Sequence, residues 1–357
     1  MATAARKKTA VIDGDGHILE PRDLWEKNLP SKFKDVAIKV VWDPETQLED
    51  ECVEGVAYVP KLATANGWAR VPMEKRADPR GWRWEELTPA GLDPKARVEE
   101  LDRDGIDQAV LYPSLGLLLG GIRDPEHAVA ACRIYNDWLA EFCSVAPDRL
   151  IGIAAVPVQD PRAAPLEARR AVEELGMRGV YVRPNASEQY LPHNPALDPL
   201  WETVQGLGIP VGLHPAGQAD TAGAAKFYQP LWGTQTRSIA KPMNFLVDDL
   251  MCLTMMIGTK VLDRFPELKV IVLECGGGWL PHWIDKMDHW VEVVPWRAPE
   301  LKPSEYIHRQ VWVSFDPDET TLPFVVDMVG DEGLIWASDF PHMDVIAPSA
   351  TQELYGI

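Results

Sequence analysis

The stretch LIGIAAVPVQDPRAAPLEARRAVEEL (residues 150–175) joins an almost continuous apolar run to a longer segment that mixes charged and apolar residues. A short run of Leu, Ile, Ala and Val predicts a strand that is buried on both faces of a parallel sheet. The second segment predicts a helix over 161–175, with Asp160 as its N-cap and Pro161 as its first residue. A strand followed by a helix is the repeating unit of an α/β fold.

Seven further apolar runs have the same form, and most of them precede a helical pattern, such as 125–145 after Asp124. The eight predicted strands are 10–17, 108–113, 150–158, 179–183, 209–214, 269–274, 311–315 and 334–338. Strands that alternate with helices imply parallel strands joined by crossovers. Eight such units predict one (β/α)8 TIM barrel that takes up the chain, residues 1–357, as a single domain.

Two long segments interrupt the regular spacing. Residues 20–97 lie between the first two predicted strands and hold five of the chain's 14 Trp, so we expect an insertion that covers the barrel mouth or forms an interface. Residues 218–256 follow the fifth strand and include a run that predicts a long helix, either in the core or at a subunit contact. Few residues follow the eighth strand, which predicts an abbreviated C-terminal helix.

Composition excludes several classes of protein. The 357 residues include 54 acidic and 35 basic side chains, and a net charge of −19 argues against binding to a phosphate backbone. The longest apolar runs are far shorter than the roughly 20 residues of a membrane span, and the first residues lack the apolar core of a secretory signal. Five scattered Cys without a CxxC pair indicate reduced thiols. We therefore expect a cytoplasmic protein that binds neither nucleic acid nor membrane.

Polar residues at the predicted strand ends are the candidates for chemistry, because active sites of this fold lie at the carboxyl ends of the strands. Asp15 and His17 end the first strand and lie on the same face of it. His214 ends the fifth strand, and Asp339 follows the eighth. Two imidazoles and two carboxylates are suitable donors for Zn²⁺, Mn²⁺ or Fe²⁺.

Several motifs resemble the amidohydrolase-related metal-dependent hydrolases, the group that contains aminocarboxymuconate-semialdehyde decarboxylase and related aromatic-acid decarboxylases. They are VIDGDGHILEP (11–21), NDWLAEFC (136–143), PDRLIG (147–152), RGVYVRPN (178–185), GLHP (212–215), ECGGGWLP (274–281) and ASDFPH (337–342). The resemblance covers nearly the whole chain. It implies a barrel with one divalent metal, zinc before manganese or iron, held by Asp15, His17, His214 and Asp339.

The chain departs from the family pattern at two positions. Many members begin with His-x-His, and Asp15 in the first place favours a weaker Lewis acid, or Mn or Fe over Zn. Related decarboxylases also carry an acid/base His where this chain has Cys275, which is interpreted either as a ligand or as a packed thiol. Glu274 can replace that His only if the strand end bends, because alternation points Glu274 and Cys275 in opposite directions.

Four further residues are candidates around this centre. Arg183 either pairs with a substrate carboxylate or with an acidic neighbour. His342 is placed to orient Asp339 through a hydrogen bond. His193 and His282 either line the mouth or pack elsewhere.

The leading hypothesis is a mononuclear metal-dependent hydrolase or non-oxidative decarboxylase of a small carboxylated substrate, with Asp339 or Glu274 moving the proton. A second hypothesis from the same resemblance is a Mn/Fe oxygenase like the α-aminoisobutyrate hydroxylases, which needs two metals and further ligands such as Glu274 or Asp318. A third is the supporting zinc-binding subunit of such a hetero-oligomer. A homodimer and a hetero-oligomer with a paralogous subunit both stay open.

Overall fold

Eight parallel strands form the centre of the computed structural model, which describes residues 9–59, 63–185, 190–216, 223–228 and 237–343, with 345, 351 and 354. Their order around the sheet is the order of the sequence. They are β1 (Ile12–His17), β5 (Gln108–Tyr112), β6 (Leu150–Ala155), β7 (Gly179–Val182), β8 (Pro210–Leu213), β9 (Lys269–Val272), β10 (Val311–Phe315) and β11 (Leu334–Trp336). The predicted (β/α)8 barrel is confirmed.

Backbone hydrogen bonds close the barrel at its carboxyl end. The Asp339 amide donates to the Asp15 carbonyl at 2.9 Å, and the His17 amide donates to the Phe340 carbonyl at 2.7 Å. The chain that leaves β11 therefore continues beside β1 and joins the last strand of the barrel to the first. This junction brings the first and last sequence motifs together.

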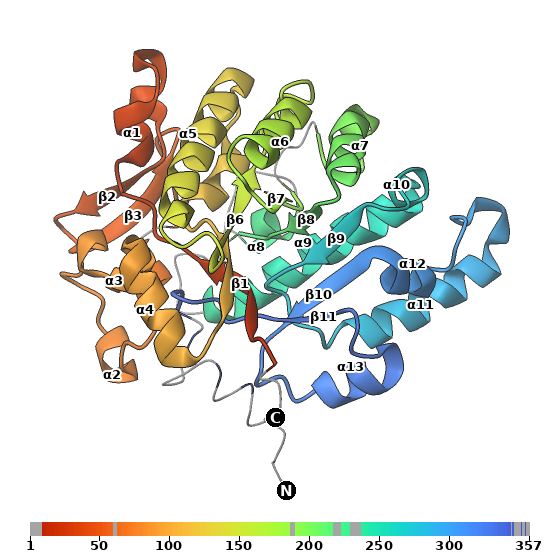
Figure 1. The fold of residues 1–357 in the computed structure, drawn as a ribbon. Helices are drawn as coiled ribbons and strands as arrows, with labels where there is room; N and C mark the ends of the chain where they lie inside the picture. The colour runs from red at the N-terminus through yellow and green to blue at the C-terminus, as the bar shows by residue number, and fades with distance from the viewer. Residues whose placement is uncertain are drawn as a thin grey trace, which may run out of the picture.

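Helices surround the strands, as Figure 1 shows. The longer ones are α4 (Pro94–Asp104), α5 (Pro125–Ser144), α6 (Ala164–Glu173), α7 (Asp198–Leu207), α9 (Arg237–Gly258), α11 (Leu280–Val293), α12 (Pro303–Gln310) and α13 (Leu322–Val329). Short helices are α1 (Leu24–Asn28), α2 (Met73–Arg76), α3 (Pro89–Leu92), α8 (Ala224–Tyr228) and α10 (Val261–Arg264). Within the described chain, none of these is long and apolar enough to cross a membrane.

The predicted start of α6 is wrong by three residues. The helix begins at Ala164, because the Asp160 carboxylate accepts the amides of Arg162 at 3.0 Å and Ala163 at 3.3 Å and caps a separate turn. Pro165 then takes the first-turn position that needs no amide hydrogen. The cap of α5 is as predicted, since the Asp124 side chain accepts the amides of Glu126 and His127.

The Trp-rich segment 20–97 includes a three-stranded antiparallel sheet of β2 (Lys39–Asp43), β3 (Leu48–Val53) and β4 (Val56–Val59). One indole attaches it to the barrel, because Trp25 Nε1 donates to the Ala131 carbonyl of α5 at 3.0 Å. Within the segment, Trp84 Nε1 donates to the Glu20 carbonyl at 2.9 Å. The Ala69 amide also donates to the Pro341 carbonyl at 3.0 Å, next to the last motif. A role as lid or interface stays a prediction.

The other interruption contains the predicted long helix, α9. Most of the predicted abbreviated C-terminal helix lies outside the described residues.

Candidate metal centre

Three predicted ligands meet at the carboxyl ends of β1 and β8. His17 Nε2 and His214 Nε2 are 3.2 Å apart, and Asp15 Oδ1 is 3.6 Å from each of them. One ligand atom from each of these residues lies within 4.8 Å of the other two. All three side chains are buried.

The backbone carbonyls that face the two Nδ1 atoms decide the tautomers of both imidazoles. His17 Nδ1 lies 2.7 Å from the Pro113 carbonyl, and His214 Nδ1 lies 2.8 Å from the Pro215 carbonyl. Because a carbonyl oxygen only accepts, each Nδ1 carries the hydrogen and each Nε2 presents a lone pair. Burial lowers the pKa of His17 to about 3 and that of His214 to about 4, so both rings stay neutral at neutral pH.

The Asp15 carboxylate has no hydrogen-bond donor among the residues that the structure describes. Burial, and then the charge of Asp13, hold the pKa of Asp15 well above its usual range. A buried carboxylate without a donor, facing two imidazole lone pairs, is stabilised by a cation. The donor set therefore fits a divalent metal ion.

Asp339 belongs to a second cluster that shares His17 with the first. Its Oδ1 lies 3.2 Å from His17 Nε2 and 2.9 Å from His342 Nδ1. The described structure thus does not gather all four predicted ligands within one 4.8 Å group, and Asp339 groups with His17 and His342 instead. The predicted role of His342, to orient Asp339 through a hydrogen bond, stays a prediction.

Glu274 approaches the centre because the strand ends before it. β9 stops at Val272, and Glu274 has a φ of 54°, in the left-handed region. The prediction from strand alternation does not apply to such a backbone. Glu274 Oε2 lies 3.8 Å from His214 Nδ1, and Lys241 Nζ lies 3.5 Å from Glu274 Oε1.

Arg183 and Cys275 also lie near this cluster. The Arg183 guanidinium is buried, lies 3.3 Å from Asn185 Oδ1, and its charge contributes to the low pKa of His214. Burial, followed by the charge of Asp249, raises the pKa of the Cys275 thiol well above its usual range. Cys275 joins neither described cluster of possible ligands.

His193 and His282 are not brought to the centre. Neither belongs to a cluster of possible ligands in the described chain, and His282 is exposed on α11. Asp318, considered for a second metal, is exposed as well and lies outside both clusters.

Asp13 and Arg97 support the centre, and the sequence analysis missed both. The Asp13 carboxylate accepts Ser338 Oγ at 2.6 Å and the Ser338 amide at 3.0 Å. Arg97 Nη1 donates to the carbonyls of His17 at 3.1 Å and Phe340 at 3.3 Å. Both side chains are buried, and the charge of each favours the ionised form of the other. They therefore tie β1 to the segment that carries Asp339.

Glu20 supports the loop after β5 in a similar way. Its carboxylate accepts the amides of Gly116 at 2.8 Å, Leu115 at 2.9 Å and Ser114 at 3.3 Å. Burial raises the pKa of Glu20 to about 7 in spite of these bonds. The feature of the sequence that could have identified Glu20 as a supporting residue was its place in the first motif, three residues after His17.

Asp249 is a further buried acid beside the centre. Burial, and then the charges of Asp248 and Asp15, hold the pKa of Asp249 well above its usual range, although a hydrogen bond with Cys275 opposes this. It lies within the 22-residue helix α9, where no motif marks it.

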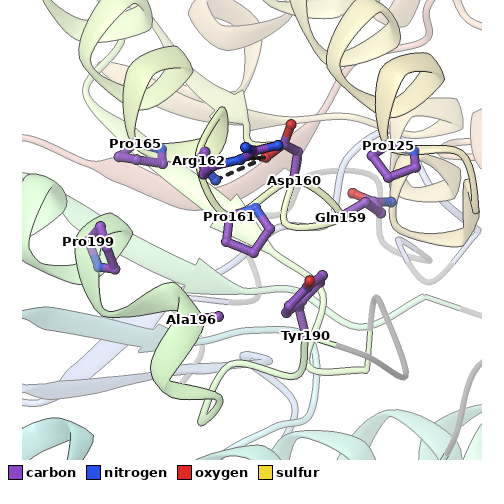
Figure 2. Close-up of a pocket in the computed structure, with 9 residues that line it drawn as sticks. All are labelled: Pro125, Gln159, Asp160, Pro161, Arg162, Pro165, Tyr190, Ala196 and Pro199. Atoms are coloured by element: carbon purple, nitrogen blue, oxygen red, sulfur yellow. Dashed lines mark hydrogen bonds and ion pairs between the residues drawn. The ribbon is translucent and has the colours of Figure 1, made fainter.

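A separate cavity of about 600 Å³ opens between the starts of α5, α6 and α7. Figure 2 shows its lining: Pro125, Gln159, Asp160, Pro161, Arg162, Pro165, Tyr190, Ala196 and Pro199. It includes none of the predicted site residues. Its one carboxylate, Asp160, already accepts two backbone amides and lies 3.7 Å from Arg162, so we assign no chemistry to this cavity.

The motifs and the geometry agree with a comparison to known families. A family profile described as amidohydrolase matches residues 12–356. The chain belongs to the amidohydrolase family.

Two curated relatives of this amidohydrolase are decarboxylases by name. The 2-amino-3-carboxymuconate-6-semialdehyde decarboxylase of Dictyostelium discoideum is 29% identical over 70% of this chain and 67% of its own length. The gamma-resorcylate decarboxylase of Polaromonas sp. (strain JS666) is 28% identical over 73% of this chain and 81% of its own length.

Solved structures share the fold. An amidohydrolase from Mycobacterium avium subsp. paratuberculosis superposes with a TM-score of 0.76 at 22% identity, covering 99% of this chain and 95% of that one. A dihydroxybenzoic acid decarboxylase from Polaromonas sp. JS666, with bound manganese and the inhibitor 2-nitroresorcinol, superposes with a TM-score of 0.67 at 20% identity and covers 97% and 94%. The oxygenase hypothesis, as catalytic or as supporting subunit, gains no support from these proteins.

Proposed function

We propose that this amidohydrolase is a divalent-metal-dependent decarboxylase that removes CO2 without oxidation from a small carboxylated aromatic substrate. The observation that carries the proposal is the convergence of two imidazole lone pairs and the donor-free Asp15 carboxylate at the barrel mouth. Decarboxylases among the relatives support the reaction type.

Asp15, His17 and His214 would hold the metal, and Asp339 would join them. When bound, the metal supplies a Lewis acid for the substrate oxygens. Two carboxylates in the donor set favour a hard ion, and a solved decarboxylase of this fold carries manganese, so we propose Mn²⁺ rather than the Zn²⁺ first expected.

The remaining residues bind the substrate and move a proton. Decarboxylation breaks one carbon–carbon bond, and the carbon that loses CO2 takes up one proton. We assign that proton to Glu274 or Asp339, because Cys275 replaces the usual His. Arg183 supplies a buried cation near His214, and we propose that it pairs with the substrate carboxylate.

The experiment incubates Mn²⁺-loaded protein with hydroxybenzoates, including 2,6-dihydroxybenzoate, and measures CO2 and the product arene. We expect equal amounts of both, no consumption of O2, loss of activity with a chelator and recovery with Mn²⁺. Arg183→Lys should raise KM, whereas Arg162→Lys at the exposed cavity should not. Full turnover after metal removal, or turnover that requires O2, would contradict the proposal.

We propose a homodimer as the assembly and keep the cytoplasm as the location. Exposed apolar side chains on α9 and α11, including Met251, Met255 and Trp290, support self-association. All five cysteines are free thiols, which suits a reducing compartment. The mass of the protein in solution, measured by light scattering, tests the assembly.

A further inference from the structure

Ser114 is hydrogen-bonded to His342, and His342 in turn makes a close polar contact with Asp339. Ser114 Oγ lies 2.8 Å from His342 Nε2, and His342 Nδ1 lies 2.9 Å from Asp339 Oδ1. Ser114 is 3% exposed and His342 is 6% exposed. The two side chains are 228 residues apart in sequence and meet only because the barrel closes here.

The order Ser–His–Asp resembles a nucleophilic triad, but the surroundings do not suit a nucleophile. A serine nucleophile needs backbone amides that are available to an oxyanion. The amides of Leu115 and Gly116, next to Ser114, donate instead to the Glu20 carboxylate at 2.9 and 2.8 Å. The serine therefore has another role.

His342 belongs to a possible ligand cluster with His17 and Asp339, but both of its ring nitrogens already have protein partners, Ser114 Oγ at Nε2 and Asp339 Oδ1 at Nδ1. Its ring stacks on that of His17, with centroids 3.9 Å apart and planes at 28°. Stacked rings direct their nitrogens side by side, whereas the rings of His17 and His214, at 4.9 Å and 85°, direct both Nε2 atoms to one point. His342 Nδ1 faces the Asp339 carboxylate.

We propose that Ser114 and His342 are positioning residues for Asp339. The Ser114 hydroxyl donates to His342 Nε2, which fixes the ring and places its hydrogen on Nδ1. That Nδ1–H then faces Asp339 Oδ1 at 2.9 Å and limits the movement of a carboxylate whose residue has a left-handed φ of 53°. The inference rests on the proposed metal site and adds two residues to its support.

A double-mutant cycle with Mn²⁺ as the probe tests this chain of contacts. His342→Leu should weaken Mn²⁺ binding about 10- to 100-fold, the usual effect of losing a residue that orients a ligand. His342→Asn keeps an N–H near the Nδ1 position, and its loss should be smaller. Ser114→Ala should weaken binding several-fold in the wild type and have no further effect in the His342→Asn background.

The matched control is His127→Gln, since His127 is as buried as His342 but stacks on Phe33, away from the centre. It should leave Mn²⁺ binding unchanged. Equal effects of Ser114→Ala in both backgrounds, or none in the wild type, would overturn the inference while the metal site stands. Wild-type protein that binds no Mn²⁺ would overturn the proposed function, and this inference with it.

A measurement without metal provides a second test. Nitrogen NMR of the metal-free protein should show His342 as a neutral ring protonated on Nδ1. Protonation on Nε2 would overturn the inference, because His342 would then have no hydrogen to donate to Asp339.

Discussion

His17 Nε2 faces His214 Nε2 at 3.2 Å, and neither nitrogen carries a hydrogen, because the Nδ1–H of each ring faces a backbone carbonyl. Two lone pairs at this distance repel each other unless a positive charge lies between or beside them. Asp15 Oδ1, at 3.6 Å from both, adds a carboxylate oxygen to the same point. The fold therefore encloses an electron-rich cluster that a cation stabilises.

Replacement of Asp15 by Asn tests the contribution of that carboxylate. The amide keeps the size of the side chain but removes the anion, so we expect Mn²⁺ binding to weaken at least about tenfold. Isothermal titration of metal-free protein measures the change. The control is Asp318→Asn, because Asp318 is exposed and was considered only as a ligand of a second metal. This variant should bind Mn²⁺ like the wild type.

Glu20 predicts a specific dependence of stability on pH. Its folded pKa of about 7 exceeds the ordinary value of 4.5, so the folded protein binds more protons than the unfolded chain between these values. The free energy of unfolding therefore falls as pH rises through this window, by roughly 3 kcal/mol in total. Urea unfolding at pH 4.5 and 8 should show that Glu20→Gln loses this dependence. If the free energy of unfolding of Glu20→Gln changes between pH 4.5 and pH 8 as much as that of the wild type, the result contradicts this prediction.

The strands and their order were predictable from the sequence, because short apolar runs that end at Gly, Pro or Asp indicate strands buried in a parallel sheet. The start of α6 was not, since Asp160 and Pro161 fit a helix cap as well as the turn that they form. A helix start at Pro161 and a separate turn are distinguished only by Pro165, which takes the first-turn position of the helix.

The centre was predictable in its members but not in its geometry. Asp15, His17 and His214 follow from strand ends, whereas Glu274 and Asp339 lie beyond them, with φ values of 54° and 53°. No periodicity applies to a left-handed residue after a strand, so the directions of both carboxylates depend on tertiary contacts. Asp13 and Arg97 were missed because their partners, Ser338 and two backbone carbonyls, are distant in sequence.

Removal of Arg97 should destabilise the protein strongly. Arg97→Met removes the two charge-assisted hydrogen bonds to backbone carbonyls and the charge that favours ionised Asp13, a change that costs about 3 to 5 kcal/mol. Arg97→Lys should recover part of this loss, since it keeps the charge but not both contacts. Urea unfolding measures both variants, and Arg133→Met, at a half-exposed ion pair, should change stability by less than about 1 kcal/mol.

Close packing against β11 explains why the first motif has a glycine at position 14. A Cβ atom there would lie 2.1 Å from Ile335 Cγ2 on β11, so Gly14→Ala should destabilise the barrel by about 1 to 3 kcal/mol. Ile335→Ala removes the opposing methyl group. The double variant should therefore be more stable than the sum of the two single changes predicts. Simple additivity in thermal or urea unfolding would show that the two strands do not meet as described.

The number of divalent metal ions per chain, measured by elemental analysis after loading with Mn²⁺ and removal of excess ion, tests the proposed metal site. We expect one ion per wild-type chain and close to none in His214→Gln, with the variant still folded by circular dichroism. A wild-type chain without metal, or a His214→Gln chain that retains a full equivalent, would contradict it.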